Sequence, residues 1–318
     1  MSPTSRGARV TFIRNFRRPT GGNIKFRDYF LHAACDPTFD SRIWFTPGSR
    51  HAQSSIWSAR DFGRVLENLA DRPHDLICVN GKDWKYLPEA LGSTRVLHFV
   101  QHAGYLDDPF LRKCLDRPAF RVCTNAFLAD QIRPFANGPV EILPIGLHDS
   151  LHEPPIPKIK GSVMILGIKQ PSFAKKLAES LCETGIESTV VGLDWIDHDR
   201  LIEHMRTAEI FVGLPAASEG CYLPALEAMA SACTVICADA GGTRGHCIDG
   251  VTCLQPPALD LQGHVAAVRR AMSDDDLCRR LRINSLAMAA GHCLAQEGHL
   301  LRRFLARALS PGAGRGTV

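Results

Sequence analysis

Short apolar runs rich in β-branched residues alternate with segments of helical period along most of the chain. Strands separated in this way by helices are typical of parallel α/β units. The first half of the chain follows this pattern throughout. Its strand candidates are 9–13, 42–45, 75–80, 95–100, 120–124 and 140–143, and its helical segments include 23–34, 61–69 and 125–135.

A proline-rich segment interrupts this alternation near the middle of the chain. Three of the four residues 154–157 are proline, which supplies no backbone N–H to a sheet or helix. The segment therefore predicts a linker between an N-terminal domain, residues 1–153, and a second domain, residues 158–295. The second domain repeats the pattern, with strand candidates at 162–166, 187–191, 209–213 and 234–238 and helices at 172–183, 199–207 and 223–230.

The end of the chain, residues 261–309, is almost wholly helical in pattern and contains no strand candidate. Residues 296–318 predict a C-terminal helix that crosses back to the first domain, followed by a flexible tail. In the alternative, the basic amphipathic helix 299–309 rests on a membrane surface. Two similar α/β domains leave a cleft between them, lined by the carboxyl ends of strands from both.

The composition is that of a globular protein. Of the 318 residues, 45% are hydrophobic and 22% charged, which is enough to bury a core in each domain and excludes a disordered chain. No uncharged apolar run reaches the roughly 18 residues of a membrane span. The longest candidate, 228–238, lies between Glu227 and Asp239, and no apolar stretch follows the N-terminal arginines. A soluble, cytoplasmic protein without a secretory signal is therefore expected.

The positive charge is concentrated at the start of the chain. The net charge is 37 − 33 = +4, too small to indicate a nucleic-acid-binding protein. Residues 1–60 contain ten Lys and Arg against three Asp, an excess of +7, so the remainder sums to −3. Such a segment can face anionic lipid headgroups or a phosphorylated substrate, and the alternative is a basic face that is simply solvated.

Twelve cysteines are present, but the chain is not a short secreted one in which they would form a disulfide framework. Cys233, Cys237, Cys247 and Cys253 lie close together in sequence, yet none is spaced as Cys-x-x-Cys. We expect free buried thiols that act as small hydrophobic side chains, and the alternative is a zinc site.

The most informative stretch is 209–257. A strand ends in a polar loop that contains Glu219 and Gly220, and Pro224 then opens a helix. This arrangement leaves backbone N–H groups and the positive end of a helix dipole for a diphosphate. Glu219 and Glu227 are carboxylates that can accept hydrogen bonds from sugar hydroxyls. In the alternative, Glu227 only complements the helix dipole and Glu219 is a solvated loop residue.

This stretch resembles the donor-site motif of family 4 glycosyltransferases, which are retaining enzymes of the GT-B fold. The resemblance rests on the Glu-x7-Glu spacing, on the glycine and proline inside it, and on the strand, glycine turn and hairpin that follow at 234–254. It is close over 209–257, looser over 160–300 and only architectural in the first half. The departures from the family are Gly220-Cys221-Tyr222 in place of Gly-Phe-Gly, Ala232 and Thr234 in place of Gly and Pro, and Gly245 in place of a glutamate.

The resemblance implies a GT-B fold of two Rossmann-like parallel-sheet domains that face a cleft, with a helical C-terminal tail. It implies transfer of a sugar from a nucleotide diphosphate donor, with UDP preferred, to an acceptor hydroxyl on a glycan, a lipid-linked molecule or a small molecule. Retention is expected from front-face attack through an oxocarbenium-like ion pair, in which the departing phosphate oxygen takes the acceptor proton. No cofactor or metal is expected, because cationic groups of the protein replace it.

The resemblance also implies roles for residues of the second domain. Lys169, just after the strand 162–166, is expected to bind the donor phosphates and stabilise the leaving diphosphate, with Lys175 as a second phosphate ligand. Glu219 is expected to position the donor sugar and Glu227 to bind the ribose hydroxyls. The residues that complete the donor loop are Gly220, Cys221, Tyr222 and Leu223.

In the first domain, the family has a glycine-rich loop at the place of Gly21 and Gly22, where it touches the donor phosphate. The alternative is an ordinary turn with Asn23 as the helix cap. His102, just past the strand 95–100, is expected near the donor sugar and the acceptor hydroxyl, whereas His98 within that strand is expected in the core.

Other functions remain open or are excluded. Asp197 and Asp199 form an Asp-x-Asp pattern, which would be the metal site of a metal-dependent glycosyltransferase, although acidic residues are common at a helix start. A non-catalytic sugar-nucleotide-binding partner subunit is a further alternative. No Gly-x-Gly-x-x-Gly follows a strand and no P-loop is present, which excludes a dinucleotide oxidoreductase and a P-loop NTPase. The acceptor, the linkage and the oligomeric state are not predicted.

Overall fold

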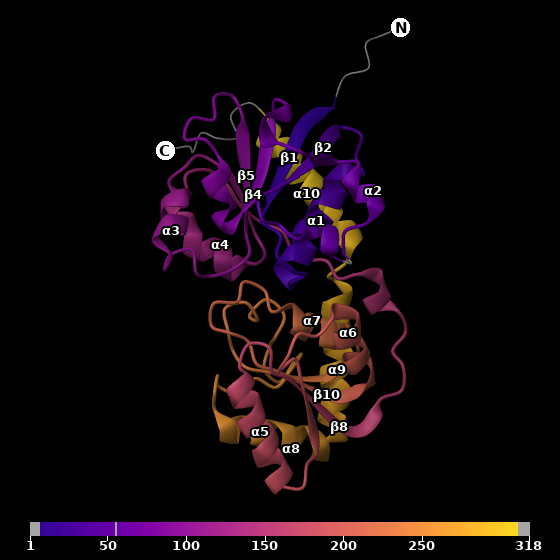
Figure 1. The fold of residues 1–318 in the computed structure, drawn as a ribbon. Coiled ribbons are helices and arrows are strands. Elements are labelled where there is room, and N and C mark those ends of the chain that lie inside the picture. Colours follow the sequence, from indigo (N-terminus) through magenta and orange to yellow (C-terminus); the bar gives the residue numbers. More distant parts are fainter. Residues whose placement is uncertain (1–6, 55, 311–318) are drawn as a thin grey trace. The chain divides into compact units, whose positions relative to one another are not determined.

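The computed structural model describes residues 7–54 and 56–310. It divides the chain into two compact units, each built on a parallel sheet with helices on both faces (Figure 1). The first unit contains the described residues up to Ile145 and from Ala295 onward, and the second contains Gly146–Leu294. The two parallel α/β units predicted by the alternating pattern are therefore present.

The sheet of the first unit has the order β3-β2-β1-β4-β5-β6-β7, and all its strands are parallel. The chain runs outward from β1 to β3 and then returns to β4 beside β1. In such sheets, loops at the carboxyl ends of the strands around this reversal form ligand sites. The strands are β1 (Ala8–Arg14), β2 (Phe39–Phe45), β3 (Val65–Leu66), β4 (Leu76–Asn80), β5 (Arg95–Val100), β6 (Phe120–Cys123) and β7 (Val140–Ile142).

Helices bury both faces of this sheet because successive strand residues point to opposite sides. Phe12 of β1 packs with α1 and α10, whereas Ile13 packs on the other face with Trp84. α10 lies beside α1 in this unit (Figure 1). The helices are α1 (Gly21–Ala34), α2 (Ala59–Phe62), α3 (Pro109–Leu115), α4 (Ala126–Ile132) and α10 (Leu294–Leu309), with 3-10 turns at His51–Gln53, Leu69–Asp71, Gly81–Tyr86 and Arg133–Phe135.

A buried charge cluster joins α10 to α1. The Lys25 ammonium lies 2.8 Å from a carboxylate oxygen of Asp28 and 2.8 Å from one of Glu297. These three side chains are almost completely buried, so each charge depends on its partners inside the unit. The cluster ties the last helix to the first one within the same core.

The helix expected over 61–69 is wrong. Ser58 and Asp61 form a capping box that starts α2 two residues earlier, and the helix ends at Phe62, with Gly63 as the C-cap residue. The next residues, Val65 and Leu66, are not helical but form β3, which pairs with the edge of β2. α3 was not expected, although Asp108 caps it and Pro109 opens it.

The second unit has a smaller parallel sheet of order β11-β10-β8-β9. Each strand alternates between two cores. Phe211 of β10 packs on one face against α6 and α7, and Val212 packs on the other with α5 and α8. The elements are β8 (Ile159–Leu166), α5 (Pro171–Glu183), β9 (Ser188–Val191), α6 (His198–Thr207), β10 (Ala208–Gly213), α7 (Leu223–Ala230), β11 (Thr234–Cys237), α8 (Leu261–Ser273) and α9 (Asp275–Ala290), with a 3-10 turn at Asp149–His152.

All twelve cysteines are free thiols, as the sequence predicts. Eight of them are buried, and burial raises the pKa of the Cys233 thiol to about 11, so it stays protonated. Over residues 7–54 and 56–310, no group of three His, Cys, Asp or Glu side chains is arranged to hold a metal ion. Within the same residues, no helix is both long and apolar enough to cross a bilayer.

Candidate functional site

Three loops meet at the carboxyl edge of the second sheet. They follow β8, β10 and β11, which are neighbours in the sheet and run in the same direction. The loop after β8 carries Lys169, the loop after β10 carries Glu219, and the loop after β11 carries Gly242. Residues far apart in the sequence are thereby brought to one place.

The first contact between these loops is an ion pair. The Lys169 ammonium lies 2.7 Å from Oε1 of Glu219. The Glu219 side chain is 15% exposed and that of Lys169 46%, so the carboxylate is held in the loop while the ammonium can change partners. The pair combines a cation suited to phosphate with a carboxylate suited to hydroxyls.

The second contact is a backbone approach that only glycine permits. A Cβ at Gly242 would lie 2.6 Å from the carbonyl oxygen of Glu219, far inside ordinary contact. The Tyr222 N–H donates to the Gly242 carbonyl at 3.1 Å, which fixes the two loops to each other. In the sequence, Gly242 is only the second glycine of a glycine turn. Such a pair of glycines is the signal that could have predicted the close approach of the two loops.

The start of α7 differs from the expected anion site. The N–H groups of Tyr222, Leu223 and Ala225 all donate to backbone carbonyls, and Pro224 has none. The prediction that free N–H groups face the loop is therefore wrong for these residues. The positive end of the helix dipole remains, because it arises from the whole helix.

The donor loop around α7 is largely buried. Gly220 and Tyr222 are buried, whereas Cys221 and Leu223 are half-buried. The Tyr222 ring fills the space beside Gly213, where a Cβ would lie 2.9 Å from ring carbon Cε1. Burial raises the pKa of Tyr222, so its phenol stays neutral.

Glu227 is buried in α7, and its partner was not predicted. His198 Nε2 lies 2.7 Å from Oε1 of Glu227, and the Glu227 side chain is 7% exposed. No hydrogen bond from a described residue reaches Oε2, which is the atom left for a ligand hydroxyl. The sequence shows His198 only as the middle residue of the Asp-x-Asp pattern.

The His198–Glu227 pair predicts a pH-dependent stability. Burial lowers the pKa of His198, but the hydrogen bond and the charge of Glu227 outweigh it and raise the pKa overall. The unfolded histidine titrates at about 6.5, so the pair stabilises the fold fully below that pH and loses its effect as pH rises through the higher folded pKa. We expect His198→Gln to cost about 1 kcal/mol more at pH 5.5 than at pH 9, in urea unfolding. His204→Gln, an exposed change on the same helix, is the control, and an equal cost at both pH values would contradict the pair.

Lys175, predicted as a second phosphate ligand, makes no ion pair with Glu219 in the part of the chain that the structure describes. It is exposed on α5, and no ion pair or hydrogen bond of its side chain is seen with any described residue. Asp197 and Asp199 lie at the start of α6, where Asp197 accepts the Asp199 N–H at 3.0 Å as a helix cap. The presence of two acidic residues at this position is explained by the helix cap and by the favourable interaction of carboxylates with the helix dipole.

In the first unit, Gly21 and Gly22 are the first two residues of α1, and Thr20 is the N-cap. The alternative of an ordinary turn with Asn23 as the helix cap is therefore wrong, because Thr20 is the cap and α1 already starts at Gly21. A Cβ at Gly22 would lie 3.1 Å from Oε1 of Gln101, the residue after β5. The same amide oxygen accepts a hydrogen bond from Asn80 at the end of β4.

His102 follows Gln101 at the same edge. Its Nδ1 accepts the Gly104 N–H at 3.2 Å, so in the neutral ring Nε2 carries the proton and acts as a donor. Its ring also lies 4.8 Å from that of Tyr105. His98 is completely buried, as expected, and burial lowers its pKa well below the ordinary value.

A polar network that was not predicted fixes the start of α1 at this edge. Arg14, the last residue of β1, donates to Asn23 at 2.6 Å and to Asp83 at 3.0 Å. Burial raises the pKa of Asp83 although the Arg14 charge opposes this. The network joins the ends of β1 and β4 to α1, next to Gly22.

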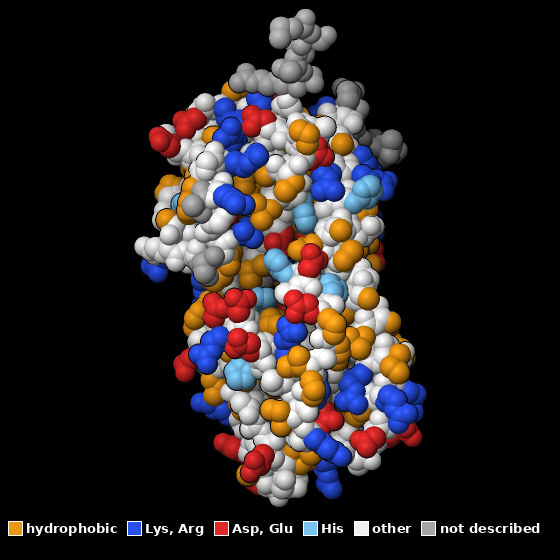
Figure 2. All heavy atoms as spheres, turned by 90° about the vertical axis from the view of Figure 1, so that its right-hand side faces the viewer, with side chains coloured by type: hydrophobic (Ala, Val, Ile, Leu, Met, Phe, Trp, Pro, Cys, Tyr) orange, Lys and Arg blue, Asp and Glu red, His pale blue; other side chains and the backbone are white. Residues whose placement is uncertain are grey.

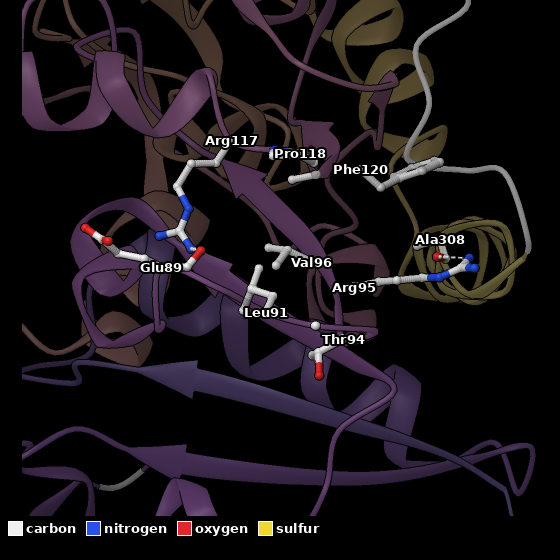
Figure 3. A pocket seen from close by; sticks show the side chains of 11 residues that line it. Glu89, Leu91, Thr94, Arg95, Val96, Arg117, Pro118, Phe120 and Ala308 are labelled. Carbon is white, nitrogen blue, oxygen red and sulfur yellow. Dashed lines mark hydrogen bonds between the residues drawn. The ribbon is translucent and has the colours of Figure 1, made fainter.

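A pocket of about 290 Å³ lies elsewhere in this unit. It is lined at the amino ends of β5 and β6 by Arg95, Val96 and Phe120, together with Arg117 and Ala308 (Figure 3). Arg95 is turned toward the Ala308 carbonyl and donates to it at 3.0 Å. The pocket is thus at the opposite edge of the sheet from Gly22 and His102.

Comparisons with known proteins find glycosyltransferases among the proteins similar to this chain. Residues 155–288 match the family model of the group 1 glycosyl transferases. The D-inositol 3-phosphate glycosyltransferase of Nocardia farcinica is 31% identical over 159 residues, which are 48% of this chain and 34% of that protein. The chain thus spans about a third of the length of this relative.

The fold is shared with solved glycosyltransferase structures. Sucrose-phosphate synthase from Thermosynechococcus elongatus has a TM-score of 0.70 at 16% identity, covering 94% of this chain and 99% of that one. The Anabaena protein HepE, solved with UDP and glucose, has a TM-score of 0.72 at 11% identity over the same shares. The predicted fold class is confirmed: the chain has the GT-B fold, and its residues 155–288 match the family model of the group 1 glycosyl transferases.

Proposed function

We propose that the chain is a retaining, family 4 glycosyltransferase that moves a sugar from a nucleotide diphosphate donor, with UDP preferred, to an acceptor hydroxyl. The observation that carries this proposal is the Lys169–Glu219 pair at 2.7 Å, at the carboxyl edge of a sheet in the group 1 domain. The complex of HepE with UDP and glucose supports the choice of nucleotide.

The pair exchanges partners when the donor binds. The diphosphate attracts Lys169, whose side chain is half-exposed, and Glu219 then accepts hydrogen bonds from hydroxyls of the donor sugar. In the transition state the bond from the anomeric carbon to the phosphate oxygen breaks, and negative charge grows on the diphosphate. Lys169 and the positive end of the α7 dipole stabilise that charge.

Configuration is retained by attack on the face that the diphosphate leaves. The acceptor oxygen bonds to the anomeric carbon, and its proton passes to the departing phosphate oxygen. Lys169 and the α7 dipole supply the electrostatic stabilisation, so the reaction is proposed to need no metal. His102, Gly21 and Gly22 are the proposed contributions of the first unit to sugar and phosphate binding.

The proposed nucleoside ligands are Glu227 and apolar side chains after β8 and β9. Glu227 accepts the ribose hydroxyls through Oε2, while His198 holds Oε1. Ile168, Leu193 and Trp195 are exposed apolar side chains after β8 and β9, with Trp195 58% exposed. A planar base can stack on such a surface.

The experiment is a thermal-shift and saturation-transfer NMR screen of UDP-, GDP- and ADP-sugars, with magnesium or with a chelator. We expect a UDP-sugar to raise Tm and to show transfer in both conditions. A chain that binds no nucleotide sugar would not be a glycosyltransferase. A strict need for magnesium would instead favour the metal-dependent alternative at Asp197 and Asp199.

Lys169→Ala should weaken UDP binding at least tenfold, since a charge-assisted contact to phosphate is worth about 1.5–3 kcal/mol. Isothermal titration with UDP measures the change. Lys176→Ala removes an exposed lysine from α5 and is the control. Lys175→Ala tests the predicted second phosphate ligand, and a loss as large as that of Lys169→Ala would confirm its role. Unchanged affinity in Lys169→Ala would remove Lys169 from the site.

A further inference from the structure

Some, but not all, of the basic side chains near the start of the chain form ion pairs with acidic side chains of the described residues. Lys and Arg side chains are spread over the face of the first unit seen in Figure 2. Several of the early arginines have acidic partners: Arg9 lies 2.6 Å from Asp75, and Arg14 lies 3.0 Å from Asp83. Arg17 and Arg50 differ, because no acidic side chain of the described residues lies within 4 Å of either guanidinium group.

These two arginines stand on loops that are fixed to each other. Arg17 is in the loop after β1 and Arg50 in the loop after β2. The Arg50 N–H donates to the Phe16 carbonyl at 2.7 Å, and the Phe16 N–H donates to Oγ of Ser49 at 3.1 Å. The Ser49 hydroxyl in turn donates to the Arg14 carbonyl at 3.2 Å. These hydrogen bonds fix the loop that carries Arg17 to the loop that carries Arg50.

The Arg17 guanidinium is oriented across a glycine. Its Nε donates to Oδ1 of Asn15 at 3.1 Å, and its two terminal nitrogens lie 3.7 Å from where a Cβ of Gly48 would be. Gly48 has a φ of +78°, which favours glycine, so the turn holds no side chain that would separate Arg17 from the β2 loop. Both arginines are exposed.

The loops lie at the edge of the sheet that also carries His102. β1 and β5 are separated only by β4, so strands spaced about 4.8 Å apart place the loop after β1 roughly 10 Å from the loop after β5. The Arg17 guanidinium lies against Gly48 of the loop after β2, so the acceptor itself has to span this distance. A group held by Arg17 and Arg50 can therefore belong to the same molecule as a hydroxyl near His102.

We propose that Arg17 and Arg50 bind a phosphate monoester on the acceptor, which makes the acceptor a phosphorylated molecule. This inference rests on the proposed function and names the substrate class. Two guanidinium groups match a phosphate dianion in charge, and each can form a bidentate pair with its oxygens. The phosphate can be that of a soluble sugar phosphate or of a lipid headgroup, since the recognised chemistry is the same.

The test measures binding of phosphorylated probes while saturating UDP fills the donor site, so that the probes cannot bind to Lys169. The probes are inorganic phosphate, glucose 6-phosphate against glucose, and phosphatidylcholine vesicles with and without phosphatidic acid. We expect the phosphorylated member of a pair to bind at least tenfold more tightly. This preference should fall at least tenfold in Arg17→Ala/Arg50→Ala and weaken with salt. A preference for glucose 6-phosphate indicates a soluble acceptor, and one confined to vesicles indicates a headgroup.

The control is Arg133→Ala, an exposed arginine of the same unit that pairs with Asp130. It should leave the preference unchanged, and Arg17→Lys should keep part of it. The proposal is overturned if no phosphorylated probe is preferred, or if Arg133→Ala costs as much as the double variant. UDP affinity should be equal in all variants. A wild-type chain that fails to bind UDP would defeat the proposed function instead, whatever the phosphate probes do.

Discussion

Glu227→Ala should lower kcat/KM for the donor about 10³-fold, since two charge-assisted hydrogen bonds to ribose hydroxyls are worth about 4 kcal/mol together. The carboxylate is buried in α7, where water replaces a lost acceptor poorly. Glu227→Gln keeps the volume and one acceptor oxygen, and it should lose less. The measurement is initial-rate kinetics with the UDP-sugar that the screen identifies, together with isothermal titration of UDP.

Variants of His198, the hydrogen-bond partner of Glu227, distinguish a structural role of Glu227 from a role in binding the donor. His198→Ala removes the same 2.7 Å hydrogen bond but leaves the carboxylate in place. It should therefore cost tenfold or less in donor affinity, whereas Glu227→Ala costs far more. Glu203→Ala, at an exposed position of α6, is the control for loss of charge. Equal losses in His198→Ala and Glu227→Ala would mean that the pair only supports the fold, and the carboxylate would no longer be a ligand for the nucleoside.

The strands and the donor loop could be predicted because their signals are local. β5 spans the predicted residues, since four of its six residues are apolar and the polar pair Gln101-His102 follows. α7 begins and ends where its proline and its apolar run indicate. The Glu219 loop follows from one motif. Each of these features is decided within about a dozen residues.

The contacts that make the site could not be predicted in this way. Lys169 meets Glu219, and His198 meets Glu227, only because the sheet order places β10 beside β8 and packs α6 against α7. The hydrophobic periodicity of the sequence does not predict the order of the strands in a sheet. In the sequence His198 is only the residue between the two aspartates of the Asp-x-Asp pattern, and the buried partner that raises its pKa lies 29 residues away.

Capping explains the two errors in the first unit. Glycine is a poor helix former, so Gly21 and Gly22 predict a loop, yet the helix starts at them because Thr20 has extended backbone angles and Gly22 packs against Gln101. The helix expected from Asp61 fails because Asp61 is the third residue of a capping box and Gly63 follows directly. A tertiary contact with Gln101 thus accompanies the start of α1, whereas a local capping box sets the start of α2.

Gly242→Ala should lower kcat/KM for the donor at least 10²-fold while the protein remains folded. The new Cβ would lie 2.6 Å from the carbonyl oxygen of Glu219 and 2.8 Å from its carbonyl carbon. Ordinary contacts begin near 3.4 Å, so the Glu219 loop must move away, and Glu219 then leaves Lys169. A displacement of about 1 Å at a reacting centre can cost on the order of 10²-fold in rate.

The matched control is Gly291→Ala in the same unit. Gly291 ends α9 with ordinary helical angles, and its nearest new contact would be 3.4 Å from the Met288 carbonyl oxygen, so this variant should keep wild-type kinetics. Circular dichroism and Tm show whether Gly242→Ala still folds. If it folds and keeps its rate within threefold, the close approach of the two loops does not position Glu219.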